Sequence, residues 1–187
     1  MVRRLLTAFG VALLGLALLA PPAAAETLVV QDPAGDGRGL GDIRALRLSQ
    51  VGSQVLVQVR TARGVDIDTA PTWNTAASGT LLRFNFDTNA DGLIDWAALL
   101  DAAEGGPQLT LMGIAQSPGR RAPVPCATVR QPEPTLIRVK VQLSCLGQPP
   151  NVRAFARYWF DAGGDGSVES IDRVRNAGWT GALPIFN

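Results

Sequence analysis

Histidine is absent from this sequence of 187 residues, and its absence limits the chemistry that the protein can perform. It excludes the Ser-His-Asp triad and His-ligated zinc sites, and it removes the commonest general base. The sequence also lacks a Gly-x-Ser-x-Gly motif and a phosphate-binding loop. Lysine is scarce too, and Lys140 is interpreted as a solvated residue of an alternating strand. We therefore expect a protein that is not an enzyme.

Neither sign of charge predominates, because the chain has 17 basic and 16 acidic residues. The basic residues are scattered singly, with Arg120-Arg121 as the only pair beyond the N-terminal segment. A balanced chain without a basic stripe lacks the electrostatic signature of nucleic-acid or anionic-membrane binding. We expect neither of these partners.

The first 25 residues have the pattern of a secretory signal peptide. Two arginines precede an apolar run over residues 5–20, and small residues at Ala23 and Ala25 predict cleavage before Glu26. The apolar run is short for a membrane span, which needs about 20 residues. We expect residues 26–187 to form a single secreted domain that has no membrane anchor after cleavage.

Cysteine occurs only at positions 126 and 145, both in the exported part of the chain. Export delivers these residues to an oxidising compartment, where a disulfide persists. We therefore predict a Cys126–Cys145 disulfide. Closing a loop of about 20 residues should stabilise the fold by roughly 3 kcal/mol.

Short β-branched and aliphatic runs, separated by Gly, Pro, Asn and Asp, predict an all-β domain. About eight or nine such strands favour two packed antiparallel sheets, a β-sandwich of jelly-roll or immunoglobulin-like type. Residues 51–53 are expected to form a tight hairpin turn, residues 63–79 a long loop, and residues 96–103 either a strand or a short helix. The predicted strands cover residues 27–31, 43–50, 54–61, 81–86, 108–114, 127–130, 136–143 and 152–160.

An acidic turn after residue 86 has the spacing of a calcium loop. Oxygen-bearing side chains recur at every second position, and Gly92 follows at the bend. The pattern is similar to an EF-hand loop, although Ala98 stands where an EF-hand places its bidentate glutamate. An Asx-rich turn without metal is the alternative. The candidate ligands are Asp87, Asn89, Asp91, Asp95 and the carbonyl of Leu93.

A second acidic turn repeats this pattern near the C-terminus. Asp172 occupies the terminal acidic position that the first turn lacks, whereas Gly163 replaces a middle ligand. A Gly-rich turn without metal is again the alternative. The candidate ligands are Asp161, Asp165, Glu169, Asp172 and the carbonyl of Ser167.

A third acidic cluster opens the exported chain with Asp-Pro-Ala-Gly-Asp at residues 32–36, followed by Gly-Asp-Ile at residues 41–43. Asp32, Asp36 and Asp42 could hold a calcium ion or cap backbone N–H groups. The sequence leaves both interpretations open.

These motifs together resemble secreted bacterial β-sandwich proteins of the DOMON and family 9 carbohydrate-binding group. The resemblance also rests on the Phe-Asp-Thr-Asn-Ala-Asp-Gly turn at residues 86–92 and on Cys-Leu-Gly at residues 145–147, before Val152-Arg153. It implies a structural calcium ion on Asp32, Asp36 and Asp42, and sugar binding by stacking on aromatic side chains. Haem-binding members use His or Met ligands, so the absence of histidine argues against a cytochrome role.

The four tryptophans are the candidate stacking residues. Trp73 in the long loop and Trp179 near the C-terminus are proposed to bind ligand, with burial in the core as the alternative. Trp96 and Trp159 lie in apolar runs and are expected in the core.

The sequence therefore predicts a secreted, calcium-stabilised, non-catalytic binding module for a glycan or a cell-envelope protein. A structural or interaction protein of the cell envelope, without a small ligand, is the alternative. A carboxylate-based glycoside hydrolase is the third candidate, because acidic residues are frequent in the turns.

Overall fold

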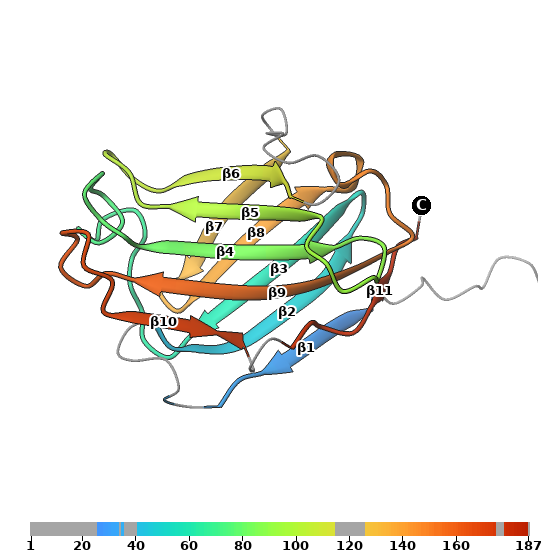
Figure 1. Cartoon of the computed structure of the whole chain (residues 1–187), viewed down its shortest axis with the longest axis horizontal. Coiled ribbons are helices and arrows are strands. Elements are labelled where there is room, and N and C mark those ends of the chain that lie inside the picture. The colour runs from blue at the N-terminus through green and yellow to red at the C-terminus, as the bar shows by residue number, and fades with distance from the viewer. Residues whose placement is uncertain (1–25, 34, 36–40, 115–125, 175–177, 187) are drawn as a thin grey trace, which may run out of the picture.

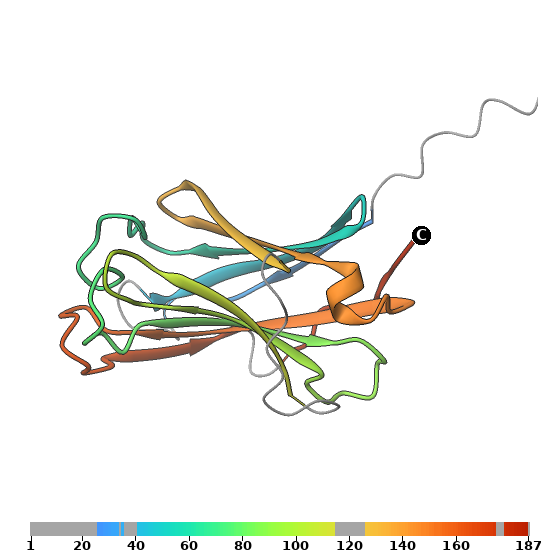
Figure 2. The same ribbon diagram turned by 90° about the horizontal axis from the view of Figure 1, so that it is seen from above.

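The chain folds into two antiparallel β-sheets that pack face to face (Figures 1 and 2). The computed structural model describes residues 26–33, 35, 41–114, 126–174 and 178–186. The predicted signal peptide, residues 1–25, lies outside the described residues. Within the described ranges, no helix has the length and apolarity needed to cross a membrane.

One sheet has five strands in the order β1-β2-β3-β8-β7 and is called the five-stranded sheet. The other, called the six-stranded sheet, has the order β10-β9-β4-β5-β6, with β11 paired to β9. Figure 1 shows the strands of the five-stranded sheet crossing behind those of the six-stranded sheet. The strands are β1 (Thr27–Gln31), β2 (Ile43–Val51), β3 (Gln54–Thr61), β4 (Leu81–Asp87), β5 (Trp96–Asp101), β6 (Gln108–Gly113), β7 (Ala127–Glu133), β8 (Leu136–Gln142), β9 (Asn151–Phe160), β10 (Ser170–Arg173) and β11 (Leu183–Pro184).

The predicted β-sandwich is confirmed, and all eight predicted strands are present with ends shifted by no more than a few residues. Residues 96–101, for which the sequence allowed a helix, form β5. The short strands β10 and β11 were not predicted, because four and two residues are too few to show an alternating pattern. Pro132 lies in β7, an edge strand, where a missing N–H is tolerated.

Alternation of side chains builds the core between the sheets. In β9, Val152, Ala154, Ala156, Tyr158 and Phe160 are buried, while the residues between them are half-buried on the other face. Strand β4 contributes its own buried residues on the same side of the sheet, where Phe84 is paired with Ala156 and Ala98. Each strand therefore has one face in the core and one on an outer face of the sandwich.

Two local predictions are confirmed. Val51 pairs with Gln54 across a two-residue turn, in which Gly52 has a φ of 57° that glycine adopts without steric cost. Cys126 and Cys145 form a disulfide with a Cα–Cα distance of 5.9 Å. It joins the segment before β7 to the 3-10 helix η2 (Leu143–Leu146), which follows β8.

Removing this disulfide should destabilise the fold. The double variant Cys126→Ser, Cys145→Ser is expected to lose about 3 kcal/mol of unfolding free energy, because its unfolded chain regains the freedom of an open loop. Urea denaturation with and without reductant measures the loss. Reductant should weaken the wild type by a similar amount and leave the variant unchanged. Equal stability of wild type and variant would contradict a structural role for the disulfide.

Candidate functional site

The turn between β4 and β5 is organised by Asp87, whose side chain is inaccessible to solvent. Its Oδ1 accepts hydrogen bonds from the backbone N–H groups of Asn89 (3.2 Å) and Ala90 (2.6 Å). Its Oδ2 accepts the Gly92 N–H at 3.0 Å and forms an ion pair with Arg153 at 3.3 Å. Asp87 thus closes the turn and already has a cation beside it.

The other acids of this turn also bond to the turn itself. Asp91 accepts the Leu93 N–H at 2.8 Å through Oδ1, and Oδ2 accepts the Asn89 side-chain amide at 3.1 Å. Asp95 accepts both the N–H and the hydroxyl of Thr88, at 2.8 and 2.6 Å. This set of contacts is that of an Asx-rich turn.

Asp161 performs the equivalent task after β9. It is inaccessible to solvent, and its carboxylate accepts N–H groups from Gly164 (2.7 Å), Asp165 (3.4 Å), Gly166 (2.7 Å) and Gly79 (2.9 Å). Desolvation alone would raise the pKa of Asp161, but these four backbone donors together hold it below its ordinary value. The Gly79 contact ties the long loop before β4 to the β9–β10 turn.

The remaining candidate ligands of the second turn do not converge on one point. Asp165 accepts the Ser167 N–H at 2.9 Å, and Glu169 accepts the Ala162 N–H at 2.5 Å. Asp172, expected as the terminal ligand, accepts the N–H of Ile43 on β2 at 2.5 Å. Its carboxylate therefore connects the two sheets.

The third cluster lies where the chain passes from β1 to β2. Asp32 and Asp42 are both buried, and Asp36 lies outside the described residues. Asp42 Oδ2 accepts the Gly35 N–H at 3.2 Å and lies 3.5 Å from the Arg44 guanidinium. Asp42 Oδ1 is buried and has no hydrogen-bond partner among the described residues.

In the described part of the chain, no three acidic side chains gather closely enough to form a metal site on their own. The turn acids act as acceptors for backbone N–H groups, which accounts for their positions without a metal. Calcium binding stays a prediction. Among the described residues of the three clusters, Asp42 at the β1–β2 connection has a buried carboxylate oxygen, Oδ1, without a hydrogen-bond partner.

The prediction that Trp73 binds ligand is wrong. Its side chain is 0% exposed and stacks on Tyr158, with ring centroids 6.0 Å apart. The loop that carries it is pinned to the sandwich by hydrogen bonds, among them Ser78 Oγ to the Thr72 carbonyl at 2.7 Å and the Ala103 N–H to the Trp73 carbonyl at 3.3 Å. A tryptophan held in this way has no face free for a sugar.

The expectation for Trp159 is also wrong, because it lies on the outer face of the six-stranded sheet. It pairs with Leu81 and Ile171 in the strand register and is half-buried, with the Arg157 guanidinium 4.9 Å from its ring centroid. Trp96, by contrast, packs against the core as expected. The apolar run around Trp159 did not show which face each residue would take.

Trp179 lies on the same face as Trp159 and remains a candidate. Its ring meets Phe155 edge to face at 4.7 Å, and the Arg153 guanidinium lies 5.5 Å from its centroid. Phe155 belongs to β9, so the half-buried side chains of this strand alternate arginine and aromatic residues. After Asn151, which is also half-buried, they are Arg153, Phe155, Arg157 and Trp159.

Two further arginines lie on the strands next to β9. Arg83 of β4 and Arg173 of β10 are the register partners of Arg157, so the three arginines lie side by side on neighbouring strands. Burial and the nearby charge of Arg157 lower the pKa of Arg83, in that order of importance. We call the outer surface formed by these three arginines with Arg153, Phe155, Trp159 and Trp179 the β9 face.

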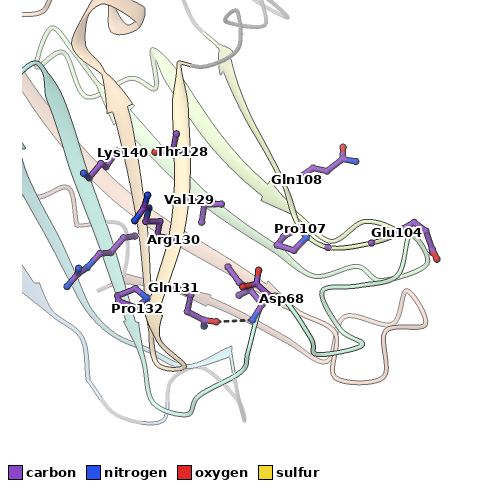
Figure 3. A pocket seen from close by; sticks show the side chains of 14 residues that line it. Asp68, Glu104, Pro107, Gln108, Thr128, Val129, Arg130, Gln131, Pro132 and Lys140 are labelled. Carbon is purple, nitrogen blue, oxygen red and sulfur yellow. Dashed lines mark hydrogen bonds between the residues drawn. The ribbon is translucent and has the colours of Figure 1, made fainter.

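A separate hollow of about 900 Å³ runs along β7 (Figure 3). Arg130, Arg138 and Lys140 line it, and none of its 14 lining residues is aromatic. Asp68 and Glu104 are both exposed and lie well apart in Figure 3.

No known family model matches the chain, and the comparison with curated proteins also gives no match. The arrangement of the β9 face therefore carries the functional argument.

Replacing Asp161 should test its role in the second turn. Because the pKa of Asp161 is lower in the folded state, its contribution is present above the unfolded pKa and is lost as the pH falls through the folded pKa. Asp161→Asn should lower the melting temperature by several degrees at neutral pH. The difference in melting temperature between wild type and variant should narrow in acid. Asp165→Asn, which removes one exposed acceptor, is the control and should have a smaller effect. A difference that widens in acid would contradict this role.

Proposed function

We propose that this protein is an exported, non-catalytic binding module whose ligand, a glycan, lies on the β9 face. The observation that carries the proposal is the alternation of arginine and aromatic side chains along β9, with Trp179 packed against Phe155. Aromatic rings provide flat apolar surface, and guanidinium groups provide hydrogen-bond donors. Sugars expose both apolar ring faces and hydroxyl groups, so this combination suits them.

The local packing supports the proposal, because it holds the aromatic rings in fixed orientations. The Arg157 guanidinium lies over the Trp159 ring, and Phe155 sets the angle of Trp179 at 85° to its own plane. Restrained side chains lose little conformational freedom on binding, and this favours affinity. The exported state is supported by the N-terminal leader pattern and by the disulfide.

We also propose that a calcium ion stabilises the β1–β2 connection. The supporting observation is Asp42 Oδ1, a buried oxygen without a hydrogen bond among the described residues, in a segment that also buries Asp32. Hard carboxylate oxygens are the ligands that calcium prefers. A bound cation would offset the cost of burying these charges.

Glycan binding can be tested by screening neutral and acidic oligosaccharides against the purified protein. Trp159→Ala should weaken binding at least about tenfold, or about 1.4 kcal/mol, because it removes a stacking surface. Phe186→Ala is the matched control, since Phe186 is 60% exposed and lies outside the β9 face. Its affinity should equal that of the wild type. Unchanged affinity in Trp159→Ala and Trp179→Ala would contradict the β9 face as the site, and absence of any glycan ligand would favour an envelope structural protein.

Calcium binding can be tested by thermal melts in calcium, magnesium and chelator. At a hundredfold excess over its dissociation constant, calcium should add about 2.7 kcal/mol of stability. This corresponds to a rise of roughly 5 to 10 °C for a domain of this size. Asp42→Asn should remove the rise, whereas Asp91→Asn in the β4–β5 turn should keep it. A melting temperature that is equal in calcium and chelator would remove the metal from the proposal.

A further inference from the structure

The arginine row of the β9 face consists of Arg173, Arg157 and Arg83, in that order across β10, β9 and β4. Residues directly opposite on neighbouring antiparallel strands have Cβ atoms about 4.5 to 5.5 Å apart. Like charges in such positions repel one another and destabilise a sheet. A bound anion would relieve the repulsion within a row of three.

The described residues do not supply a compensating negative charge. Their ion pairs lie elsewhere, at Arg44–Asp42, Arg60–Glu133 and Arg153–Asp87. The carboxylate closest to Arg83 in the strand register is Asp101 on β5. It pairs with Leu81, two residues before Arg83, and has no ion pair with Arg83. Burial raises the pKa of Asp101, so its surroundings disfavour the charged form.

The donors of the row are also incompletely used. Arg83 Nε donates to Asn85 Oδ1 at 2.6 Å, whereas Arg157 Nε is shielded from solvent and has no acceptor among the described residues. An anion on the row would engage the terminal nitrogens of the guanidinium groups, and charge-assisted hydrogen bonds of this kind are strong. Trp159 lies beside Arg157 and offers an apolar surface at the same place.

We propose that the β9 face binds an acidic glycan, with the carboxylate or sulfate groups of the sugar on the Arg83–Arg157–Arg173 row and the sugar rings against Trp159 and Trp179. This inference rests on the proposed function, and it adds the charge of the ligand. The arginines recognise the acidic groups, and the tryptophans recognise the sugar rings.

The five-stranded sheet provides a natural comparison. Arg130 and Arg138 are also register partners on its outer face. There, Arg138 Nε donates to Gln58 Oε1 at 2.9 Å, and no aromatic residue lines the adjoining hollow. The acidic glycan is assigned to the β9 face because, of these two described surfaces, the β9 face combines the cations with aromatic rings.

The test is a calorimetric titration of the full-length protein, in the form in which it is purified, with oligogalacturonate and with a neutral galactose oligomer of equal length. Oligogalacturonate should bind at least about tenfold more tightly, and its affinity should fall as salt is added. Arg157→Gln should lose about tenfold for oligogalacturonate, because a hydrogen bond between charged groups is lost. It should weaken binding of the neutral oligomer less, so that the ratio of the two affinities falls. Arg138→Gln, on the opposite sheet, is the matched control and should bind as the wild type does.

A thermal melt of each variant separates ligand binding from folding. Arg157→Gln should be at least as stable as the wild type, because it relieves repulsion within the row. Arg173→Gln, at an exposed position, provides a second variant that does not disturb buried packing. It should also weaken oligogalacturonate binding.

Each contrary outcome has its own meaning. Equal binding of the acidic and neutral oligomers, unaffected by Arg157→Gln and Arg173→Gln, would overturn this inference and leave glycan binding intact. Loss of oligogalacturonate binding in Arg138→Gln alone would overturn it by placing the anion on the five-stranded sheet. Failure of both oligomers to bind would overturn this inference. If no other oligosaccharide in the screen binds either, the proposed function is overturned as well.

Discussion

The pairing of β4 with β9 in the middle of the six-stranded sheet is the constraint on which the rest of the structure depends. Its register places Phe84 opposite Ala156 on the core side and Arg83 opposite Arg157 on the outer side. Because side chains alternate along a strand, a slip of one residue would exchange the two faces. Core packing thereby fixes the positions of the arginine and aromatic side chains that β4 and β9 contribute to the β9 face. The surface that we propose for binding is thus held in place by the core beneath it.

Two buried aspartates close opposite ends of this strand pair. Asp87 follows Phe86 at the end of β4 and forms an ion pair with Arg153 at the start of β9, while Asp161 follows Phe160 and accepts backbone N–H groups from two turns. Both carboxylates accept backbone N–H groups, and among the described residues Asp87 also has a guanidinium cation beside it. In both cases the acid organises a turn, which explains why the sequence around each resembles a calcium loop.

The near neutrality of the chain conceals a separation of charge. Acidic residues gather in the turns at the ends of the sandwich, where they accept hydrogen bonds from the backbone. Arginines gather on the outer faces of the sheets, on β9 and its neighbours and on β7 and β8. Net charge alone therefore gave no indication of a cationic surface, and the expectation that a basic stripe is absent applies to the sequence but not to the folded sheet.

The sequence by itself determined eight of the eleven strands, the hairpin at Gly52, the disulfide and the positions of the acidic turns. These features depend on neighbouring residues or, for the only two cysteines, on the compartment that the N-terminal pattern predicts. Tertiary structure decided the orientation of the tryptophans, turning Trp73 into the core and Trp159 outward. It also assembled the arginine row. Arg83 and Arg157 are 74 positions apart in the sequence, and Arg157 and Arg173 are 16 positions apart. Strand pairing brings such residues together, and the register that does so is selected by the packing of two whole sheets, which no local pattern records.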